Sequence, residues 1–528
     1  MSEQGIPDFT AGLSWPDSAR VRVNARQALC VVECEASDLI TICERLWIER
    51  GYAFAGLIVE ELSESWELRY VFYGNRDAGW VHVVTRQPLT DRTFPSISSV
   101  VHAADWHERE AEDLFGLRFE GHPRLGDFIL HNDRWHEELA PMRHRFDASK
   151  PVTHRAPDLD WRPRRVVEAP GAFVMPIGPK FGGMTESVHF LLETVGEDVI
   201  RTFPRLFYKY RAIEKIAEGR TAENALLLAE RFAAATGFSH ALGFSQAVET
   251  ICETRIPERA RALRILLAEI ERFRHHVGAI QEICESTSLL VANSQMAMLE
   301  EDLLRLSGAL TGHRYLFGLA VPGGLARRLD DSDCRAAVRR AQDVLKGLEK
   351  LETMLRKSSS FLDRLEEVGF VSHDEAHGYG LVGPVARASN VVRDLRKDQP
   401  YTGCEELAFD VAVEREGDGY ARLRVLFEEC RQSVSLMEQV VAALPSGPEV
   451  IGELKILGGS ALGWVEAPRG AAFHWLHLDD RQRITRYRLI TPSFANWHGF
   501  HLAAEDFAFQ DFPIILATFD LSVAESDR

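Results

Sequence analysis

The stretch ERFAAATGFSHALGFSQAVE, residues 230–249, has the pattern of a helix that should end at a buried metal site. Its small residues leave room for a bulky group, and His240 follows at the next turn. A metal site needs thiolate, imidazole or carboxylate ligands. No cysteine or carboxylate lies between Arg231 and His240, so the segment has the outline of a metal site without its ligands.

Composition narrows the class of protein. The chain has 528 residues, which is too long for one hydrophobic core, so two or more domains are expected. A net charge of −18 argues against binding to nucleic acid or to an anionic membrane surface, because both attract clustered lysine and arginine. No apolar run reaches the ~18 residues of a membrane-spanning helix. The eight scattered cysteines form no CxxC pair, which is typical of reduced, structural thiols.

Hydrophobic periodicity divides the chain into two domains and a linker. It predicts an α+β domain over residues 1–145 and a mainly α-helical domain over 173–528, with small β-sheet pieces at the start and end of the latter. Residues 146–172 hold several prolines and little periodicity, which indicates a linker. Further expected elements are helices at 36–52, 106–115, 257–284 and 333–365, and strands at 66–74, 80–89, 405–415 and 472–490.

Two predicted helices carry acid–base groups on one face. These groups are Glu108, Glu112 and Asp113 on the first helix, and Glu269, Arg272 and His276 on the second. Paired carboxylates can transfer protons, but a solvated or partner-facing surface explains the first set better, since no nucleophile lies nearby. For the second set we favour a buried ion network over a proton relay, although imidazole and carboxylate groups can both exchange protons near neutral pH.

Two short motifs present further polar side chains. GMTESVHF (183–190) places Glu186 and His189 three residues apart at a predicted turn between strands. EAPRG (466–470) holds Arg469 between proline and glycine. There the guanidinium can project into a cleft or form a structural ion pair, and the pattern alone leaves both readings open.

Several motifs together resemble known families. HEREAEDLFGLRFEGHP (107–123) resembles the 30-kDa subunit of respiratory complex I. GPKFGGMTESVHF (178–190), RILLAEIERFRHHV (264–277), GPVARASNVVRDLR (383–396) and EAPRGAAFHW (466–475) resemble the complex I 49-kDa subunit. They resemble still more closely the large subunit of membrane-bound NiFe hydrogenases of the hydrogenase-4 and formate hydrogenlyase type. The resemblance implies that both modules are fused in one chain.

The resemblance also explains the opening stretch. In these hydrogenases four cysteines hold nickel and iron. The matching positions here are Ala233 and Thr236 in the first pair and Ser522 and Glu525 in the second. Methyl and hydroxyl groups cannot replace soft thiolate ligands, and a single carboxylate favours harder ions. The resemblance therefore implies a chain that holds no NiFe centre and no other metal.

A quinone is the other ligand that the resemblance suggests for this cavity. The histidine and tyrosine that bind the quinone headgroup in complex I correspond to Thr185 and Ala234, so those hydrogen bonds are missing. An altered quinone site could use His240, Tyr208 and Tyr210, because an apolar slot with a few polar groups can hold a headgroup.

Four polar residues of the family's cavity are retained: Glu186, His189, His240 and Arg469. The resemblance gives Glu186 a role in proton transfer and places Arg469 over the metal position. These residues either keep the cavity packed and hydrated or still move protons or bind a polar ligand.

The resemblance implies a large subunit in the peripheral arm of a membrane oxidoreductase, on the cytoplasmic face of the inner membrane. It would lie beside an iron–sulfur small subunit and antiporter-like membrane subunits. It would bind no cluster itself, since its cysteines form no ligand set. Electron transfer, with a quinone as acceptor, would be coupled to ion translocation. The alternative is a scaffold without redox chemistry that assembles an ion-translocating complex.

Overall fold

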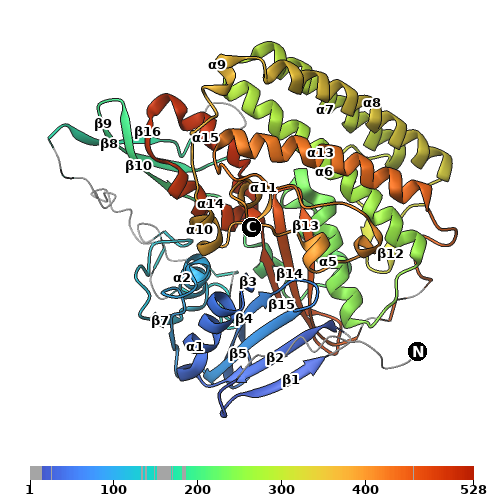
Figure 1. The fold of residues 1–528 in the computed structure, drawn as a ribbon. Coiled ribbons are helices and arrows are strands. Elements are labelled where there is room, and N and C mark those ends of the chain that lie inside the picture. The colour runs from blue at the N-terminus through green and yellow to red at the C-terminus, as the bar shows by residue number, and fades with distance from the viewer. Residues whose placement is uncertain are drawn as a thin grey trace.

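The structure is a computed structural model that describes most of the chain. The described residues are 15–24, 27–131, 135–136, 139–147, 149–150, 168, 170–180, 186–452, 454–455 and 457–528. They form an N-terminal α+β region and a larger, mainly helical region that begins and ends with β-strands (Figure 1). The predicted fold class is therefore confirmed.

The N-terminal region is built on one five-stranded sheet. Its strands are β1 (Arg20–Asn24), β2 (Leu29–Cys34), β3 (Ala53–Glu61), β4 (Ser65–Tyr73) and β5 (Trp80–Pro88). The order is β1-β2-β5-β4-β3, with β2 and β5 parallel and the other neighbours antiparallel. Strands β3 and β4 are buried along most of their length. Their nearly continuous apolar sequence follows, because a sheet covered on both faces loses the alternation of a half-exposed strand.

The remaining N-terminal elements cover one face of this sheet or extend its edge. They are η2 (Ala36–Asp38), α1 (Leu39–Glu44), η3 (Arg45–Glu49), β6 (Thr93–Pro95), η4 (His102–Ala104), α2 (Asp105–Phe115) and β7 (Arg118–Glu120). Helix α2 ends at Gly116, as the sequence predicts. The φ of 70° at this residue suits glycine, which carries no Cβ.

The larger region contains three sheets. They are β8 (Ala172–Ile177), β9 (His189–Val195), β10 (Asp198–Arg205) and β16 (Glu505–Ala508), in the order β16-β10-β9-β8; the pair β11 (Ala320–Val321) and β12 (Gly324–Leu325); and the meander β13 (Gly459–Ala467), β14 (Gly470–Leu478) and β15 (Ile484–Ile490). The meander lies against the N-terminal sheet, where Val71 of β4 shares a hydrophobic core with Phe473 of β14.

Helices make up the rest of the larger region. They are α3 (Ile213–Ala217), α4 (Ala222–Arg231), η5 (Ala234–Thr236), α5 (Gly237–Ile251), α6 (Glu258–Ser286), α7 (Leu290–Thr311), α8 (Asp331–Leu355), α9 (Ser359–Leu362), α10 (His373–Gly378), α11 (Gly383–Ala388), α12 (Leu395–Asp398), η6 (Cys404–Glu406), α13 (Gly419–Ala442), α14 (Pro492–Ala503), η7 (Phe509–Asp511), α15 (Phe512–Phe519) and α16 (Val523–Ser526). Helices α6, α7, α8 and α13 form a bundle beside the meander (Figure 1).

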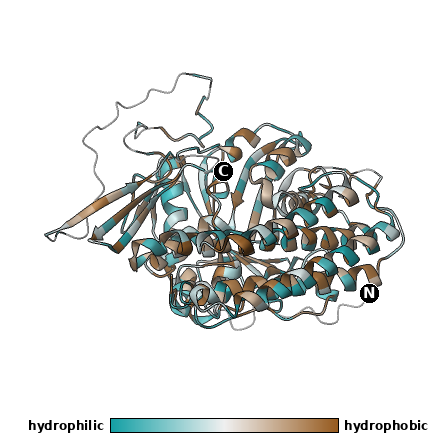
Figure 2. Ribbon diagram, turned by 90° about the horizontal axis from the view of Figure 1, so that it is seen from above, coloured by the Kyte–Doolittle hydropathy of each residue, from teal (hydrophilic) through white to brown (hydrophobic). Residues whose placement is uncertain are grey.

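The long helices of the bundle are amphipathic. Coloured by hydropathy, they mix polar and apolar residues along their length instead of carrying one continuous apolar stretch (Figure 2). Within the described residues, no helix is both long and apolar enough to cross a membrane.

Helix α5 reaches the core through a close backbone contact with β13. A Cβ at Gly463 would lie 2.0 Å from the carbonyl oxygen of Gly243 and 2.7 Å from the backbone nitrogen of Ala247. Only glycine lets a helix and a strand approach this closely. This contact holds the helix that carries His240 against the meander that carries Arg469.

The predicted strand at 405–415 is wrong. Residues 405 and 406 belong to η6, and 407–415 belong to no strand among the described residues. Instead, the side chain of Gln439 on α13 accepts a hydrogen bond from the Ala408 backbone N–H and donates one to its carbonyl, each at 2.9 Å. One amide side chain replaces the neighbouring strand that the alternating pattern suggested.

The predicted domain boundaries fall in a poorly described part of the chain. Of the expected linker at 146–172, residues 148, 151–167 and 169 lie outside the described residues. The first described strand of the larger region is β8. The limits 1–145 and 173–528 stay predictions.

Candidate functional site

Three of the four predicted ligand positions lie together. Helix α4 ends at Arg231, and the chain turns through η5 before α5 begins. In this turn the Thr236 hydroxyl donates to Glu525 Oε1 at 3.0 Å. Ser522 caps the four-residue helix α16, since its hydroxyl accepts from the Glu525 backbone N–H at 3.2 Å. Ala233 is also buried, and its carbonyl accepts from the Thr236 N–H at 3.2 Å.

The carboxylate of Glu525 is the centre of this cluster. It is fully buried and accepts hydrogen bonds from Thr236, from the Ser493 hydroxyl at 2.6 Å and from Arg469 Nη1 at 3.3 Å. Burial alone would raise its pKa, but Arg469, His240 and Ser493 together hold the pKa well below its ordinary value. Glu525 is therefore ionised. We call Glu525, Thr236, Ser493, Arg469 and His240 the Glu525 cluster.

His240 belongs to a buried chain of ring contacts. Its Nδ1 lies 3.3 Å from His474 Nε2, and His474 Nδ1 lies 2.9 Å from the Tyr487 hydroxyl. Burial raises the pKa of Tyr487, so its hydroxyl keeps its proton. Burial lowers the pKa of His474, so this ring is neutral and has one N–H to donate, to either His240 or Tyr487. His240 Nε2 lies 3.9 Å from Glu525 Oε1.

Arg469 is fixed by a second carboxylate. Its Nε donates to the Asp520 carbonyl at 2.6 Å, and its Nη2 donates to Asp520 Oδ1 at 3.1 Å. Asp520 Oδ2 lies 2.6 Å from His275 Nε2. Burial lowers the pKa of His275 to about 4, although Asp520 opposes that shift. Of the two readings that the sequence left open for Arg469, the contacts show an ion pair with Asp520 and Glu525.

Glu186 lies at the edge of the cluster. Its Oε2 accepts a hydrogen bond from the Ala524 backbone N–H at 2.6 Å, and its Oε1 lies 3.4 Å from Arg211 Nη2. Glu186 thus contacts the residue that precedes Glu525 in helix α16.

His189 and the two tyrosines are placed differently. His189 Nδ1 lies 3.3 Å from the Tyr208 hydroxyl, and burial beside Arg205 lowers the pKa of His189. Burial together with Glu214 raises the pKa of Tyr210. His240 contacts His474 instead, and a shared quinone cavity of His240, Tyr208 and Tyr210 stays a prediction.

Of the two positions matched to the quinone headgroup contacts of complex I, the structure describes one. Thr185 lies outside the described residues. Ala234 begins η5 and is exposed. Its methyl group offers no hydrogen bond.

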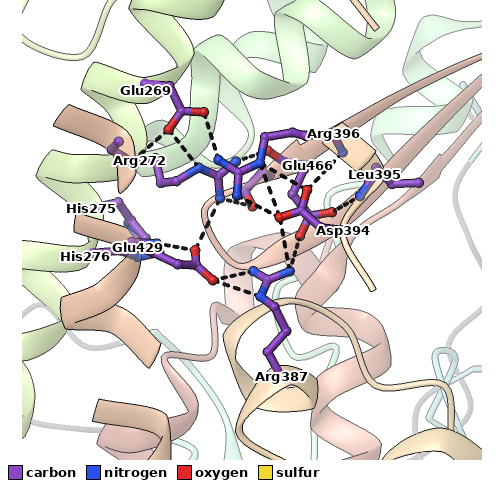
Figure 3. A network of polar contacts seen from close by, with 12 residues as sticks. Glu269, Arg272, His275, His276, Arg387, Asp394, Leu395, Arg396, Glu429 and Glu466 are labelled. Carbon is purple, nitrogen blue, oxygen red and sulfur yellow. Dashed lines mark hydrogen bonds and ion pairs between the residues drawn. The ribbon is translucent and has the colours of Figure 1, made fainter. Parts of the chain in front are cut away.

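A buried charge network lies next to His275 and includes other residues of helix α6 (Figure 3). It consists of the carboxylates Glu269, Asp394, Glu429 and Glu466, the guanidinium groups Arg272, Arg387 and Arg396, and His276. All are at most 2% exposed. The predicted grouping of Glu269, Arg272 and His276 is thus a buried ion network completed by α11, α12, α13 and β13.

Charge within this network is unevenly shared. Burial alone would raise the pKa of Glu429, but Arg387 at 2.7 Å and His276 at 2.9 Å lower it well below its usual range. Burial raises the pKa of Glu466 to about 7, and the neighbouring Asp394 adds to the shift against the pull of Arg387. Four carboxylates face three guanidinium groups, so Glu466 is where the network binds a proton most readily.

The prediction that Glu108, Glu112 and Asp113 lie on a solvated or partner-facing helix surface is wrong. Glu108 is fully buried, and its carboxyl group accepts from the Ile97 backbone N–H at 2.9 Å. Burial raises the pKa of Glu108 to about 7 and that of Asp113 to about 7. Glu112 is partly buried and accepts from the Gly126 N–H at 2.6 Å. Glu112 and Asp113 therefore hold the following loop against α2, whereas Glu108 holds the preceding segment at Ser96 and Ile97.

Sequence reasoning missed several residues of the Glu525 cluster and its surroundings. Asp520 begins the segment DLSVAESDR (520–528), which holds two of the ligand positions. His474 lies within the motif EAPRGAAFHW. Both residues could have been found because they lie in or beside these motifs. Ser493 and Tyr487 lie outside every motif, and only the fold brings them close.

Comparisons with known proteins first define the class. Residues 32–152 match the family described as respiratory-chain NADH dehydrogenase, 30 Kd subunit. Residues 292–458 and 449–528 match respiratory-chain NADH dehydrogenase, 49 Kd subunit. The chain therefore belongs to the family in which 30-kDa-like and 49-kDa-like parts of this dehydrogenase are joined in one polypeptide.

Individual relatives then narrow the comparison. Formate hydrogenlyase subunit 5 from Escherichia coli (strain K12) is 31% identical over 454 residues, which cover 85% of this chain and 79% of the relative. Hydrogenase-4 component G from the same organism is 27% identical over 85% of this chain and 78% of its own length. The C/D subunit of NADH-quinone oxidoreductase from Bdellovibrio bacteriovorus is 29% identical over 80% of this chain and 81% of its own length. The predicted resemblance is confirmed.

Proposed function

We propose that this chain is the large subunit in the peripheral arm of a membrane oxidoreductase related to formate hydrogenlyase and NADH-quinone oxidoreductase, and that it carries no NiFe centre. The observation that carries the second part is the Glu525 carboxylate. It occupies a ligand position, and its oxygens already accept from Arg469, Thr236 and Ser493.

The residues at the ligand positions do not fit a NiFe centre. Two thiolate pairs would be needed, and the chain offers a methyl group, two hydroxyls and one carboxylate. Hydroxyl and carboxylate oxygens suit hard cations rather than nickel held by sulfur. The guanidinium of Arg469, 3.3 Å from Glu525, also places a positive charge where a cation would bind. We therefore derive no step through a metal at this position.

In the proposed complex, electrons arrive from the clusters of an iron–sulfur small subunit, because this chain has no cysteine set for a cluster. A quinone is the proposed acceptor, with His240, Tyr208 and Tyr210 as candidate contacts. Glu186, His189 and Arg469 are proposed to serve the proton path of the same cavity. The contacts from Glu186 to Ala524, and from Glu525 to Arg469, Asp520 and His275, support a polar path that leads to α6.

The proposed partners and location follow from the family. The chain would lie on the cytoplasmic face of the membrane, peripheral to antiporter-like subunits that translocate ions. Its own described helices include none that could cross the membrane, which agrees with a peripheral position.

The test is metal analysis of the intact, purified complex. We expect iron from the small subunit and nickel far below one atom per chain, with no dihydrogen turnover. One nickel per chain would refute the proposal.

A scaffold without redox chemistry is the second candidate function. It is favoured by the exposed methyl group of Ala234, where a headgroup ligand is expected. Titration of the intact complex with a quinone analogue separates the two candidates. Binding that is lost in Tyr208→Phe and kept in the distant control Tyr315→Phe supports the redox subunit, whereas failure of any quinone to bind or be reduced supports the scaffold.

A further inference from the structure

A second cavity lies between the N-terminal sheet and the C-terminal meander. Its volume is about 600 Å³. One wall comes from β2, β4 and β5, and the other from β13, β14 and the segment 399–405. Small-molecule sites typically enclose ~300–1,000 Å³. None of the residues of the Glu525 cluster lines this cavity, so it is a separate site.

Aromatic side chains from both sheets line the cavity. The rings of Trp80 on β5 and Trp464 on β13 have centroids 4.8 Å apart. Trp475 on β14 lies 6.0 Å from the ring of His82. Three indoles and an imidazole in one cavity suit a flat ring system, because aromatic faces gain energy from offset or edge contacts beyond the area that they bury.

One of the three indoles lacks a hydrogen-bond partner. Trp464 Nε1 donates to the Gln399 carbonyl at 2.7 Å, and Trp475 Nε1 donates to Glu60 Oε1 at 2.6 Å. Trp80 is only 3% exposed, and its Nε1 has no acceptor among the described residues. This atom is closed off from solvent, so a molecule in the cavity would touch the ring of Trp80 and not its N–H.

The polar rim of the cavity is positively charged. Arg69 lies 4.8 Å above the ring of Trp475 and already pairs with Glu67 at 2.6 Å. Arg76 is exposed and makes no ion pair with any residue that the structure describes. The acid among the lining residues, Glu405, is bound to Arg261 at 3.1 Å. The Arg76 guanidinium is therefore available for an anion.

We propose that this cavity binds a small planar aromatic anion. Its ring would lie against the indoles, and its acidic group would pair with Arg76. The acidic group can be a carboxylate or a phosphate, since both accept from a guanidinium. The site goes beyond the proposed function and stands without it, because it uses neither the cluster nor a metal.

Isothermal titration calorimetry of the full-length chain tests this proposal. The probes are 2-naphthoate, which carries a ring and a carboxylate, and adenosine monophosphate, which carries a ring and a phosphate. We expect saturable binding of at least one probe, and the probe that binds identifies the acidic group. Adenosine and inorganic phosphate alone should each bind about tenfold more weakly or worse, since each lacks half of the contacts.

Matched variants distinguish the cavity from general effects on folding. Trp80→Phe and Arg76→Glu should each weaken binding about tenfold, because the first removes part of the aromatic wall and the second removes the guanidinium that pairs with the acidic group. The control Trp66→Phe removes an equally buried, unpartnered indole N–H outside the cavity. The control Arg339→Glu makes the same charge change on α8.

Absence of saturable binding by both probes would overturn the proposal. Equal weakening by Trp66→Phe and Trp80→Phe, or by Arg339→Glu and Arg76→Glu, would overturn it as well. None of these results depends on the nickel content or quinone binding of the complex.

Discussion

The substitution Glu466→Gln tests whether the buried charge network holds a proton near neutral pH. Glu466 Oε1 accepts from Arg387 Nη1 at 2.9 Å, and Oε2 accepts from the Leu395 backbone N–H at 3.0 Å. Glutamine keeps the shape of the side chain but has one acceptor oxygen and cannot titrate. It therefore costs one hydrogen bond, about 1–2 kcal/mol at every pH.

The pH-dependent part of the difference in unfolding free energy follows from the pKa of Glu466. The pKa rises from an ordinary value of 4.5 to about 7 in the folded chain, through burial and then through Asp394. One pKa unit corresponds to about 1.36 kcal/mol, so the carboxyl group contributes about 3 kcal/mol of pH-dependent stability. A raised pKa means that this stability is fully present below pH 4.5 and is lost as pH rises to about 7. The variant lacks this loss, so relative to the parent it should gain about 3 kcal/mol between these limits.

The assay is urea unfolding followed by tryptophan fluorescence at several pH values between 5 and 8. The difference in unfolding free energy between parent and variant cancels other titrating groups. The matched control is Glu429→Gln in the same network. The pKa of Glu429 is held well below its ordinary range, so this substitution should cost about 3–5 kcal/mol with no pH dependence in that window.

A difference between parent and Glu466→Gln that stays constant from pH 5 to 8 would refute the reasoning. It would mean that the network is either neutralised by another group or fully ionised. A pH-dependent difference in the Glu429→Gln control would place the proton on Glu429 instead.

Two further substitutions probe the candidate site and its scaffold. Glu525→Gln should lower the unfolding free energy by about 3 kcal/mol at pH 7, because Arg469 loses a buried partner. Since the pKa of Glu525 is lowered from 4.5, this cost should be present above pH 4.5 and shrink in thermal unfolding scans as pH falls below it; an equal cost at pH 3 contradicts the assignment. Gly463→Ala should cost more than about 3 kcal/mol, because its Cβ would meet helix backbone at 2.0 Å, which cannot yield as a side chain can. Gly452→Ala, where nothing lies within 4 Å, should leave the thermal midpoint unchanged, and equal stability of both variants would show that the close contact is absent.

The sequence allowed the fold to be predicted better than the site. The strands at 66–74 and 80–89 and the long helices were identified because their hydrophobic periods are regular. The strand expected at 405–415 has the same alternation, but the Gln439 side chain on α13 replaces a neighbouring strand. Periodicity reports which faces are buried and not what buries them.

The site was only partly predictable for a related reason. Small residues and a motif mark the opening stretch, where Thr236 in η5 and His240 on α5 are both buried. The partner that neutralises Glu525 could not be assigned from the sequence, because Arg469 and Ser493 reach it from β-strand and helix ends far along the chain. Burial of Glu108 was also missed, since its neighbours on the helix are charged and resemble a solvated face.

The two buried clusters act on each other through neighbouring residues of α6. Asp520 lies beside the Glu525 cluster, and Glu525 and Asp520 both pair with one guanidinium, that of Arg469. His275 contacts Asp520, while the adjacent His276 contacts Glu429 in the network; the two ring centroids are 6.1 Å apart. Burial lowers the pKa of both rings, and the charge of Asp520 opposes that shift at His276 as well as at His275. A change of charge at Asp520 therefore acts on the network through neighbouring residues of α6, which is the kind of coupling that the proposed ion movement requires.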